Sequence, residues 1–517
     1  MRLFTTVAAL RCYLELRRKE QKSMGRSAIS AIGLVPTMGA LHVGHLSLIE
    51  RARQENGTVI VSTFVNPLQF GPKEDFQSYP RTLESDRILC AQAGVDAIFA
   101  PTAKELGAEQ GLHSLSQVVP PASMTEVLCG KSRPGHFQGV ATIVTKLFNL
   151  VQPDKAYFGQ KDGQQLAIIR RLVRDLNFSI EIVGCPTVRE PSGLAMSSRN
   201  QYLTSEQKEQ AAVLYRSLQQ AEIGFKAGER LAANLLAIVR QELAIISAVE
   251  YVELVDPNTL MPLEKIEEQG MLAIASRIGA ARLIDNIVLN SRQPIVAIDG
   301  PAGAGKSTVA RQVAAALDLV YLDTGAMYRA LTWLVLESGI DLNDLPAIAE
   351  LASSCQIQLA SSTGLDNPVR VWINEREVTQ DIRSLEVTAH VSQVASQSAV
   401  RQELLRQQQR WGQKGGLVAE GRDIGTHVFP DAELKIFLTA SVRERARRRQ
   451  QDFEHQGQTT LTLEQLEKSI AERDFLDSTR ELAPLQKAPD AIEICTDGLS
   501  IAEVTAKIVS YYHELGY

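Results

Sequence analysis

The chain has 517 residues, 44% of them hydrophobic and 22% charged, which describes a globular protein too long for a single hydrophobic core. Its formal net charge of −6 argues against a general binder of nucleic-acid polymers. The six cysteines form no Cys-x-x-Cys pair, the N-terminus is broken by charge and no apolar run reaches membrane length, so we expect a cytoplasmic protein without disulfides and without a membrane partner.

Short apolar runs alternate with helical patterns in the first part of the chain. The sequence predicts helices at 82–94 and 162–176. The predicted strands around them span 31–35, 58–64, 96–100, 155–158 and 178–184. This alternation is typical of an α/β fold with a parallel sheet.

The pattern of predicted helices and strands changes near Thr204. Two long helices are predicted at about 205–225 and 228–246, followed by strands at 249–255 and 271–276. We interpret them as a small α+β subdomain of about 186–290, which completes a first domain, 1–290, whose Rossmann-like part is about 1–185. A second α/β domain, 291–517, begins with the strand of "QPIVAIDG" and follows without a low-complexity linker.

The segment "GPAGAGKS", from Gly300 to Ser307, fits the pattern G-x-x-x-x-G-K-[ST] between a predicted strand and a predicted helix. Glycines let several backbone N–H groups point at phosphate oxygens, and the helix N-terminus adds favourable partial charge. Lys306 is placed to neutralise the β- and γ-phosphates, and Ser307 to ligate Mg²⁺. The predicted ATP-binding residues are Gly300, Ala302, Gly303, Ala304, Gly305, Lys306, Ser307 and Thr308. An accidental match is disfavoured because strand, loop and helix are in register.

Arginines recur after later strands of this domain. Thr324 and Arg329 follow one strand and Arg422 and Asp423 follow another, while "SVRERARRRQ" holds five arginines within seven residues. Such a run is usually a solvated helix face. In an acidic chain, however, its recurrence at strand ends favours a second bound anion, as in phosphoryl transfer between two nucleotides.

The motifs "DTGAMYR", "DIRSLEVT", "VAEGRDIGT", "DAELKIFLTAS" and "ERDFLDSTR" resemble the bacterial cytidylate kinase family from about residue 293 onward. The resemblance implies a P-loop nucleoside monophosphate kinase that phosphorylates CMP or dCMP with ATP and Mg²⁺. It also implies a CMP-binding insertion at about 350–390, a lid at about 441–480 and Arg447 as a further ATP-binding residue. The CMP site would comprise Thr324, Arg329, Arg401, Arg422, Asp423, Arg473, Asp477 and Arg480. A GTPase is disfavoured because no Asn-Lys-x-Asp motif is present.

In the first domain, "VPTMGALHVGHLSLIE" places His42 and His45 at a strand-to-helix turn. The pair is open to three interpretations: metal ligands, ring nitrogens satisfied by backbone, or donors to phosphate. Polar residues at other predicted strand ends favour the third interpretation, phosphate binding. They carry Asn66 and Gln69; Lys161, Asp162 and Gln165; and Ser197, Ser198 and Arg199. Histidine, lysine, serine and arginine would hold a triphosphate, Asp162 would hold Mg²⁺, and the amides would hold a small polar acid.

The motifs "PTMGALHVGHL", "VNPLQFG", "RPGHFQGVATIV", "FGQKDGQQL" and "MSSRNQYL" resemble the pantothenate synthetase family over roughly 23–290. The resemblance implies a Rossmann-like nucleotidyltransferase fold with a HIGH-type signature. It implies condensation of pantoate with β-alanine through pantoyl adenylate, driven by ATP going to AMP and pyrophosphate, and it implies a homodimer. Val43 and Gly163 depart from the family, which usually has Glu and commonly an aromatic residue at these positions.

The residues implied for the synthetase reaction gather at the predicted strand ends. Those for ATP are Met38, His42, His45, Gly159, Lys161, Asp162, Val188, Met196, Ser197, Ser198 and Arg199, and those for pantoate are Asn66, Gln69 and Gln165. The catalytic residues would be His42, His45 and Lys161 here and Lys306 in the second domain, with Asp162 and Ser307 as Mg²⁺ ligands. Two alternatives to a bifunctional enzyme stay open: a nucleotide switch in which one half has lost catalysis, and a metal-binding or scaffolding role for the histidine turn.

Overall fold

The computed structural model describes residues 1–23, 31–72, 74–246, 248–360, 369–455, 462–479 and 483–516. The chain divides into two compact units, Met1–Ser291 and Arg292–Tyr517, and each is described by itself. Within the described ranges no helix is long and apolar enough to cross a membrane. All six cysteines are free thiols.

The first unit is built on a six-stranded parallel sheet in the order β1-β4-β3-β2-β5-β6. Its strands are β1 (Arg2–Phe4), β2 (Ile32–Thr37), β3 (Thr58–Thr63), β4 (Ala97–Phe99), β5 (Lys155–Gly159) and β6 (Glu181–Cys185). Its longer helices are α1 (Val7–Ser23), α2 (Val43–Glu55), α3 (Leu83–Gln92), α6 (His136–Val151) and α7 (Gly163–Asp175), and its short ones η2 (Pro67–Gln69), η3 (Leu112–Ser114), α4 (Ala122–Thr125) and α5 (Leu128–Ser132). The predicted parallel α/β architecture is confirmed, although β1 was not predicted.

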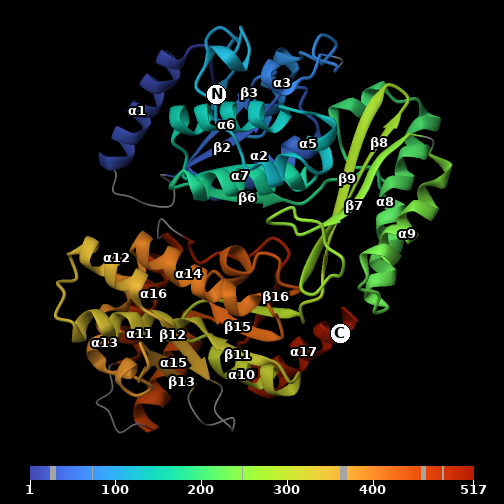
Figure 1. Cartoon of the computed structure of the whole chain (residues 1–517). Helices are drawn as coiled ribbons and strands as arrows, with labels where there is room; N and C mark the ends of the chain where they lie inside the picture. Colours follow the sequence, from blue (N-terminus) through green and yellow to red (C-terminus); the bar gives the residue numbers. More distant parts are fainter. Residues whose placement is uncertain are drawn as a thin grey trace. The chain divides into compact units, whose positions relative to one another are not determined.

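Helices cover both faces of this sheet (Figure 1). Side chains along β3 alternate between the faces: Ile60 joins the core under α1, α6 and α7, whereas Val59 and Val61 join the core under α2 and α3. Strands β2 and β5 are neighbours, yet α2 leads from β2 to β3 and α7 leads from β5 to β6. The loops after β2 and β5 therefore diverge at the topological switch point, where α/β sheets bind ligands.

The remainder of the unit packs two helices on an antiparallel sheet in the order β7-β8-β9. The elements are η4 (Ser198–Tyr202), α8 (Ser205–Lys226), α9 (Ala232–Glu242), η5 (Leu243–Ile245), β7 (Val249–Val255), β8 (Gln269–Ile278) and β9 (Ala281–Asn290). Below, "the small sheet" denotes β7, β8 and β9. The sequence did not predict β9, because Asp285 interrupts its apolar pattern, and the structure buries this carboxylate against Arg189.

The second unit has a five-stranded parallel sheet in the order β11-β15-β10-β16-β17. Its strands are β10 (Ile295–Asp299), β11 (Val320–Asp323), β15 (Leu417–Gly421), β16 (Leu434–Thr439) and β17 (Ile492–Cys495). Its helices are α10 (Lys306–Ala316), α11 (Thr324–Glu337), α12 (Leu345–Ser354), α13 (Leu385–Ala395), α14 (Ser398–Gly412), α15 (Val442–His455), α16 (Leu463–Thr479), α17 (Ile501–Glu514), η6 (Asp381–Arg383) and η7 (Ile424–Val428). A small antiparallel sheet, β12 (Ile357–Ala360), β13 (Arg370–Ile373) and β14 (Arg376–Glu377), lies within the stretch predicted as the insertion.

Candidate active sites

A cavity of about 510 Å³ opens at the carboxyl edge of the six-stranded sheet. The loops that follow β2, β3, β5 and β6 line it, together with residues 196–199 and part of the small sheet. It brings together every residue that the sequence analysis named for the synthetase reaction: Met38, His42, His45, Asn66, Gln69, Gly159, Lys161, Asp162, Gln165, Val188, Met196, Ser197, Ser198 and Arg199.

The turn between β2 and α2 fixes the two histidines. The buried carboxylate of Asp86 accepts hydrogen bonds from the backbone N–H groups of Ala40 (3.1 Å) and Leu41 (2.9 Å), so the turn is tied to α3. His42 caps α2, and its Nδ1 accepts a 3.1 Å hydrogen bond from the Gly44 N–H. Because Nδ1 is the acceptor, Nε2 carries the proton of the neutral ring and is left to donate into the cavity.

Both histidines are neutral at pH 7. Burial, followed by the charge of Lys161, lowers the pKa of His42 to about 4. Burial also lowers the pKa of His45 to about 3, with further effects from His42 and Lys161. Nδ1 of His45 is buried and has no hydrogen-bond partner in the part of the chain that the structure describes. The pair therefore offers neutral donors and acceptors to a ligand rather than positive charges.

Lys161 supplies the positive charge. Among the described residues its ammonium has no hydrogen bond or ion pair with a protein group, and the nearby carboxylates of Asp285 and Asp162 only partly offset the burial that lowers its pKa. Asp162 caps α7, since its Oδ1 accepts a 3.0 Å hydrogen bond from the Gln165 N–H. An ammonium without an internal partner, facing a polar cavity, is suited to a phosphate.

Asn66 and Gln69 have different environments. The Asn66 amide is buried and is used internally: it accepts from the Leu68 N–H (3.0 Å) and donates to Gly139 O and to Gln69 Oε1 (both 3.1 Å). The Gln69 amide donates to Met38 Sδ at 2.7 Å and lines the cavity. Asn66 therefore helps to orient Gln69 while it also lines the cavity, and its direct contact with pantoate stays a prediction.

Sequence analysis missed a polar network behind Gln69. Arg133 forms a paired salt bridge with Glu74, with both N–O distances 2.6 Å, and its Nη1 lies 3.1 Å from His136 Nε2. His136 Nδ1 in turn lies 2.7 Å from the Gln69 carbonyl oxygen. These residues line the cavity. Their signal was available, because "RPGH" places an arginine and a histidine three residues apart at the start of α6, as "HVGH" places two histidines at the start of α2.

Arg199 is also paired within the protein. Its guanidinium binds both oxygens of Asp75, at 2.8 and 2.9 Å, and the adjacent Ser198 Oγ lies 3.2 Å from the Tyr79 hydroxyl. These contacts join the segment after β3 to residues 198–199 across one side of the cavity. The charge of Arg199 is therefore partly compensated within the protein.

In the second unit the phosphate-binding loop has backbone that only glycine adopts readily. Gly300 has φ of 147°, and a Cβ there would lie 2.1 Å from Leu438 O; Gly303 and Gly305 have φ of 80° and 86°. Lys306 is the first residue of α10, and its Nζ donates a 2.7 Å hydrogen bond across the loop to Pro301 O. Burial and then the charge of Arg422 hold the pKa of Lys306 well below its usual range.

Carboxylates from neighbouring strand ends surround this loop. Ser307 Oγ donates to Glu420 Oε2 at 2.9 Å, and the Tyr321 hydroxyl donates to Glu420 Oε1. Burial, followed by Asp323, raises the pKa of Glu420. Asp299 accepts the N–H groups of Ile424 and Gly425, each at 2.7 Å, and burial raises its pKa to about 6. Sequence analysis missed Glu420, although it ends an apolar strand beside the loop.

Three of the arginines predicted to hold the acceptor are paired with carboxylates. Arg401 and Asp423 form a buried ion pair. Arg422 pairs with Asp477 at 2.9 Å and Arg329 with Asp323 at 3.0 Å, while Thr324 Oγ1 donates to Glu420 O at 2.7 Å. Nε of Arg473 is buried without a partner among the described residues, and burial and then Arg422 lower its pKa. Arg480 lies outside the described residues.

Arg447, which the sequence analysis named for ATP, has its charge paired within its own helix. Its guanidinium pairs with Glu444 on the same helix at 2.8 Å and is 56% exposed. Arg445 contacts the phosphate-binding loop instead: its Nη1 donates to Ala302 O at 3.1 Å, and it is paired with Asp474 of α16. Arg448 donates to Thr496 O at 2.9 Å on the same side. The helix therefore presents Arg445 and Arg448, not Arg447, to the loop. Thr308 lies exposed in the first turn of α10.

Magnesium prefers oxygen ligands and usually keeps several from water and substrate phosphates. The hydroxyl of Ser307 beside the Glu420 carboxylate fits this preference, as does the single carboxylate of Asp162 in the first cavity. Within the described residues no group of three or more His, Cys, Asp or Glu side chains is arranged to hold a metal ion. The histidine turn thus gains no support as an all-protein metal site.

Two family profiles together span nearly the whole chain. One described as pantoate-beta-alanine ligase matches residues 2–288, and one described as cytidylate kinase matches residues 296–514.

Similar proteins extend over both parts. A bifunctional pantoate ligase/cytidylate kinase of Trichormus variabilis is 68% identical, with 99% of each chain covered. One of Trichodesmium erythraeum is 56% identical, covering 100% of this chain and 98% of the relative. A solved pantothenate synthetase of Thermus thermophilus matches with a TM-score of 0.51 and 47% identity, over 56% of this chain and 99% of its own. The chain belongs to the bifunctional pantoate ligase/cytidylate kinase family, and it is a pantoate–β-alanine ligase joined to a cytidylate kinase.

Proposed function

We propose that the ligase cavity first converts pantoate to pantoyl adenylate and then transfers the pantoyl group to β-alanine. The observation that carries this proposal is the cavity itself, in which the Lys161 ammonium, the neutral rings of His42 and His45, and the amides of Gln69 and Gln165 face one space. The cations and donors suit a triphosphate, and the amides suit the hydroxyl and carboxylate groups of a small acid.

The first step brings two anions together. A pantoate carboxylate oxygen attacks the α-phosphorus, the bond from that phosphorus to the bridging oxygen breaks, and pyrophosphate leaves. Lys161 and the ring N–H groups of His42 and His45 stabilise negative charge that develops on the phosphate oxygens. Asp162 would hold Mg²⁺ against the phosphates, and the ion would supply further charge neutralisation there.

In the second step the amine of β-alanine attacks the acyl carbon, the bond to the AMP oxygen breaks, and the amine loses a proton. An acyl adenylate hydrolyses readily in water, so the site must exclude solvent. The contacts of Arg199 with Asp75 and of Ser198 with Tyr79 support this, because they close one side of the cavity.

For the second unit we propose transfer of the γ-phosphoryl group of ATP to CMP or dCMP. Lys306 and the loop N–H groups would bind the β- and γ-phosphates, with Ser307 and Glu420 holding Mg²⁺. Arg329, Arg422 and Arg473 would bind the phosphate of the acceptor. Arg401 and Asp423 would read the cytosine edge, and their burial supports this role because a buried donor–acceptor pair rejects a base of the wrong pattern.

Each half is proposed to act independently, the ligase within 1–290 and the kinase within 291–517, with ATP, pantoate, β-alanine and CMP or dCMP as its small-molecule partners. The resemblance to the pantothenate synthetase family implied a homodimer, and we propose that the chain forms one through the ligase half. Sedimentation at several concentrations tests this assembly. A cytoplasmic location is also proposed, and the six free cysteines support it.

The half-reactions test the proposal. Pantoate-dependent exchange of pyrophosphate into ATP reports the first step, and synthetic pantoyl adenylate with β-alanine reports the second. His42→Ala and Lys161→Ala are expected to suppress exchange by about 100-fold, while added pantoyl adenylate restores much of the second step. An equal loss of both steps would contradict these roles. Formation of CDP and of pantothenate by the purified chain tests whether both halves are active enzymes. A nucleotide switch with one inactive half would form only one of the two products.

A further inference from the structure

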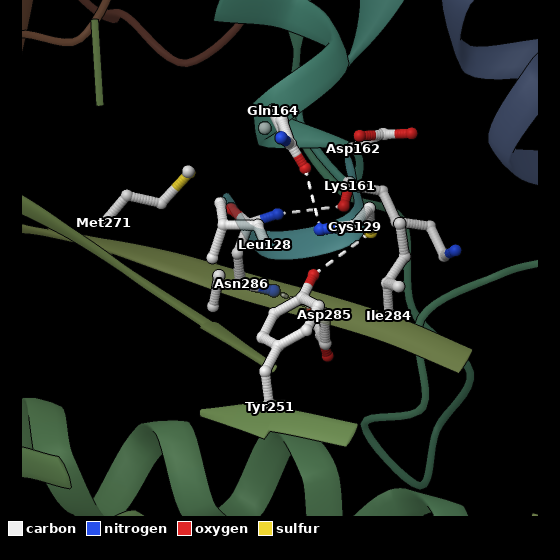
Figure 2. Close-up of a pocket in the computed structure, with 12 residues that line it drawn as sticks. Leu128, Cys129, Lys161, Asp162, Gln164, Tyr251, Met271, Ile284, Asp285 and Asn286 are labelled. Atoms are coloured by element: carbon white, nitrogen blue, oxygen red, sulfur yellow. Dashed lines mark hydrogen bonds between the residues drawn. The ribbon is translucent and has the colours of Figure 1, made fainter. Parts of the chain in front are cut away.

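The loop that carries Lys161 is held from behind by β9 of the small sheet (Figure 2). Nδ2 of Asn286 donates to two consecutive carbonyl oxygens, Gln160 O at 3.0 Å and Lys161 O at 2.8 Å. On the other side of the loop, the Gln160 N–H donates to Cys185 O at the end of β6, at 2.8 Å. One amide therefore fixes the direction of both peptide groups next to the lysine.

Asn286 is not part of the ligase cavity. It lies with Asp285 and Met271 around a gap of only about 10 Å³, whereas Lys161 lines both this gap and the large cavity. In Figure 2 the Lys161 ammonium points away from Asn286. The asparagine thus contacts the lysine only through its backbone and does not reach the space proposed for ATP.

Packing leaves the loop little freedom to shift against the small sheet. A Cβ added at Gly163 would lie 2.4 Å from Met271 Sδ and 3.5 Å from Asn286 Cγ. The neighbouring Asp285 is held by both guanidinium nitrogens of Arg189, at 2.6 and 3.0 Å. Because these neighbours are themselves fixed, the Asn286 amide has a defined place from which to hold the two carbonyls.

We propose that Asn286 is a positioning residue for adenylate formation: by binding the carbonyls of Gln160 and Lys161, it sets where the Lys161 ammonium meets the nucleotide. Asn286 is thereby coupled to the reaction without touching its substrates. This inference rests on the role proposed for Lys161 in the first step. A displacement of about 1 Å at a reacting group is enough to cost on the order of 100-fold in rate.

The test uses the full chain with Asn286→Ala, Asn286→Asp, Lys161→Ala and the double variant Lys161→Ala/Asn286→Ala. Aspartate keeps the shape of asparagine but cannot donate to carbonyls, so it serves if the alanine variant folds poorly. Ser276→Ala is the matched control, because Ser276 lies in the small sheet and its Oγ also donates to a backbone carbonyl, Ala248 O at 3.0 Å, away from the loop. CDP formation and thermal unfolding report the integrity of each preparation.

Both Asn286 variants are expected to slow pantoate-dependent pyrophosphate exchange by on the order of 10- to 100-fold. They should leave the reaction of added pantoyl adenylate with β-alanine near its original rate. In the Lys161→Ala background, the Asn286 substitution should add little to the loss of exchange. Ser276→Ala should leave exchange intact. Unchanged exchange in both Asn286 variants, multiplicative losses in the double variant, or an equal loss in Ser276→Ala would overturn the inference. Intact exchange in Lys161→Ala would instead contradict the role proposed for the lysine itself.

Discussion

The imidazole rings of His42 and His45 lie with their centroids 4.1 Å apart and their planes tilted by 35°. Two imidazolium ions at that separation, beside the Lys161 ammonium, would repel one another in a partly buried site. The pKa values, about 4 for His42 and about 3 for His45, describe a pair that stays neutral. At neutral pH each ring therefore keeps one N–H group that can donate to a phosphate oxygen, and it adds no positive charge.

Burial predicts that three histidine rings have lowered pKa values, about 4 for His42 and about 3 for His45 and His136. An unfolded histidine titrates near 6.5, so below that pH the unfolded state binds more protons and the ligase unit loses stability as pH falls toward 4. Histidine-selective NMR, with His42→Gln, His45→Gln and His136→Gln to assign the signals, measures each value. A titration of any of these rings near pH 6.5 would show that burial does not control the site.

The departure at Gly163 is explained by Met271, which occupies the space that a side chain would fill. Gly163→Phe is expected to destabilise the ligase unit by about 1–3 kcal/mol through overpacking. Adding Met271→Ala should recover part of that loss, so the two substitutions together should cost less than the sum of their separate effects. Thermal unfolding followed by circular dichroism measures the coupling. Additive costs would mean that the aromatic ring is accommodated elsewhere.

The buried Arg401–Asp423 pair yields a stability prediction for the kinase unit. Asp423→Ala leaves a buried guanidinium without this partner and should cost about 3–5 kcal/mol, whereas Asp423→Asn keeps an acceptor and should cost less. All three tryptophans, Trp333, Trp372 and Trp411, belong to this unit, so their fluorescence during urea unfolding reports it selectively. Pantothenate formation by the same preparations controls for the other unit. Equal stability of the two variants would contradict the expectation that an acceptor for Arg401 recovers part of the loss.

The strand-end loops were predictable because apolar periodicity locates strands, and parallel strands end at one edge of their sheet. That reasoning placed His42, Lys161 and Gln69 around a common space. It missed β9, because Asp285 faces inward against Arg189, which lies 96 residues earlier in the chain. It also missed the contact between Arg133 and Glu74, which are 59 residues apart. Neither pairing has a local signal in the sequence.

Helix geometry explains why Arg445 and Arg448, rather than Arg447, contact the phosphate-binding loop. A run of arginines shows that a helix is charged but not which members face a ligand. Residues three apart share a face, so Arg445 and Arg448 lie together on the side of the phosphate-binding loop, and Arg447 is turned toward Glu444. Similarly, the spacing of "VNPLQFG" placed Asn66 near the ligand but gave no sign that its amide would be used by Gly139 and Gln69.

The central claim is that one chain holds two separate sites, each with its own lysine for the phosphates of ATP. Pantothenate and CDP formation by the full-length Lys161→Ala and Lys306→Ala variants test it most directly. Lys161→Ala should lower pantothenate formation by about 100-fold and leave CDP formation unchanged, and Lys306→Ala should do the reverse. A loss of both activities in either variant, with the protein still folded, would contradict the account.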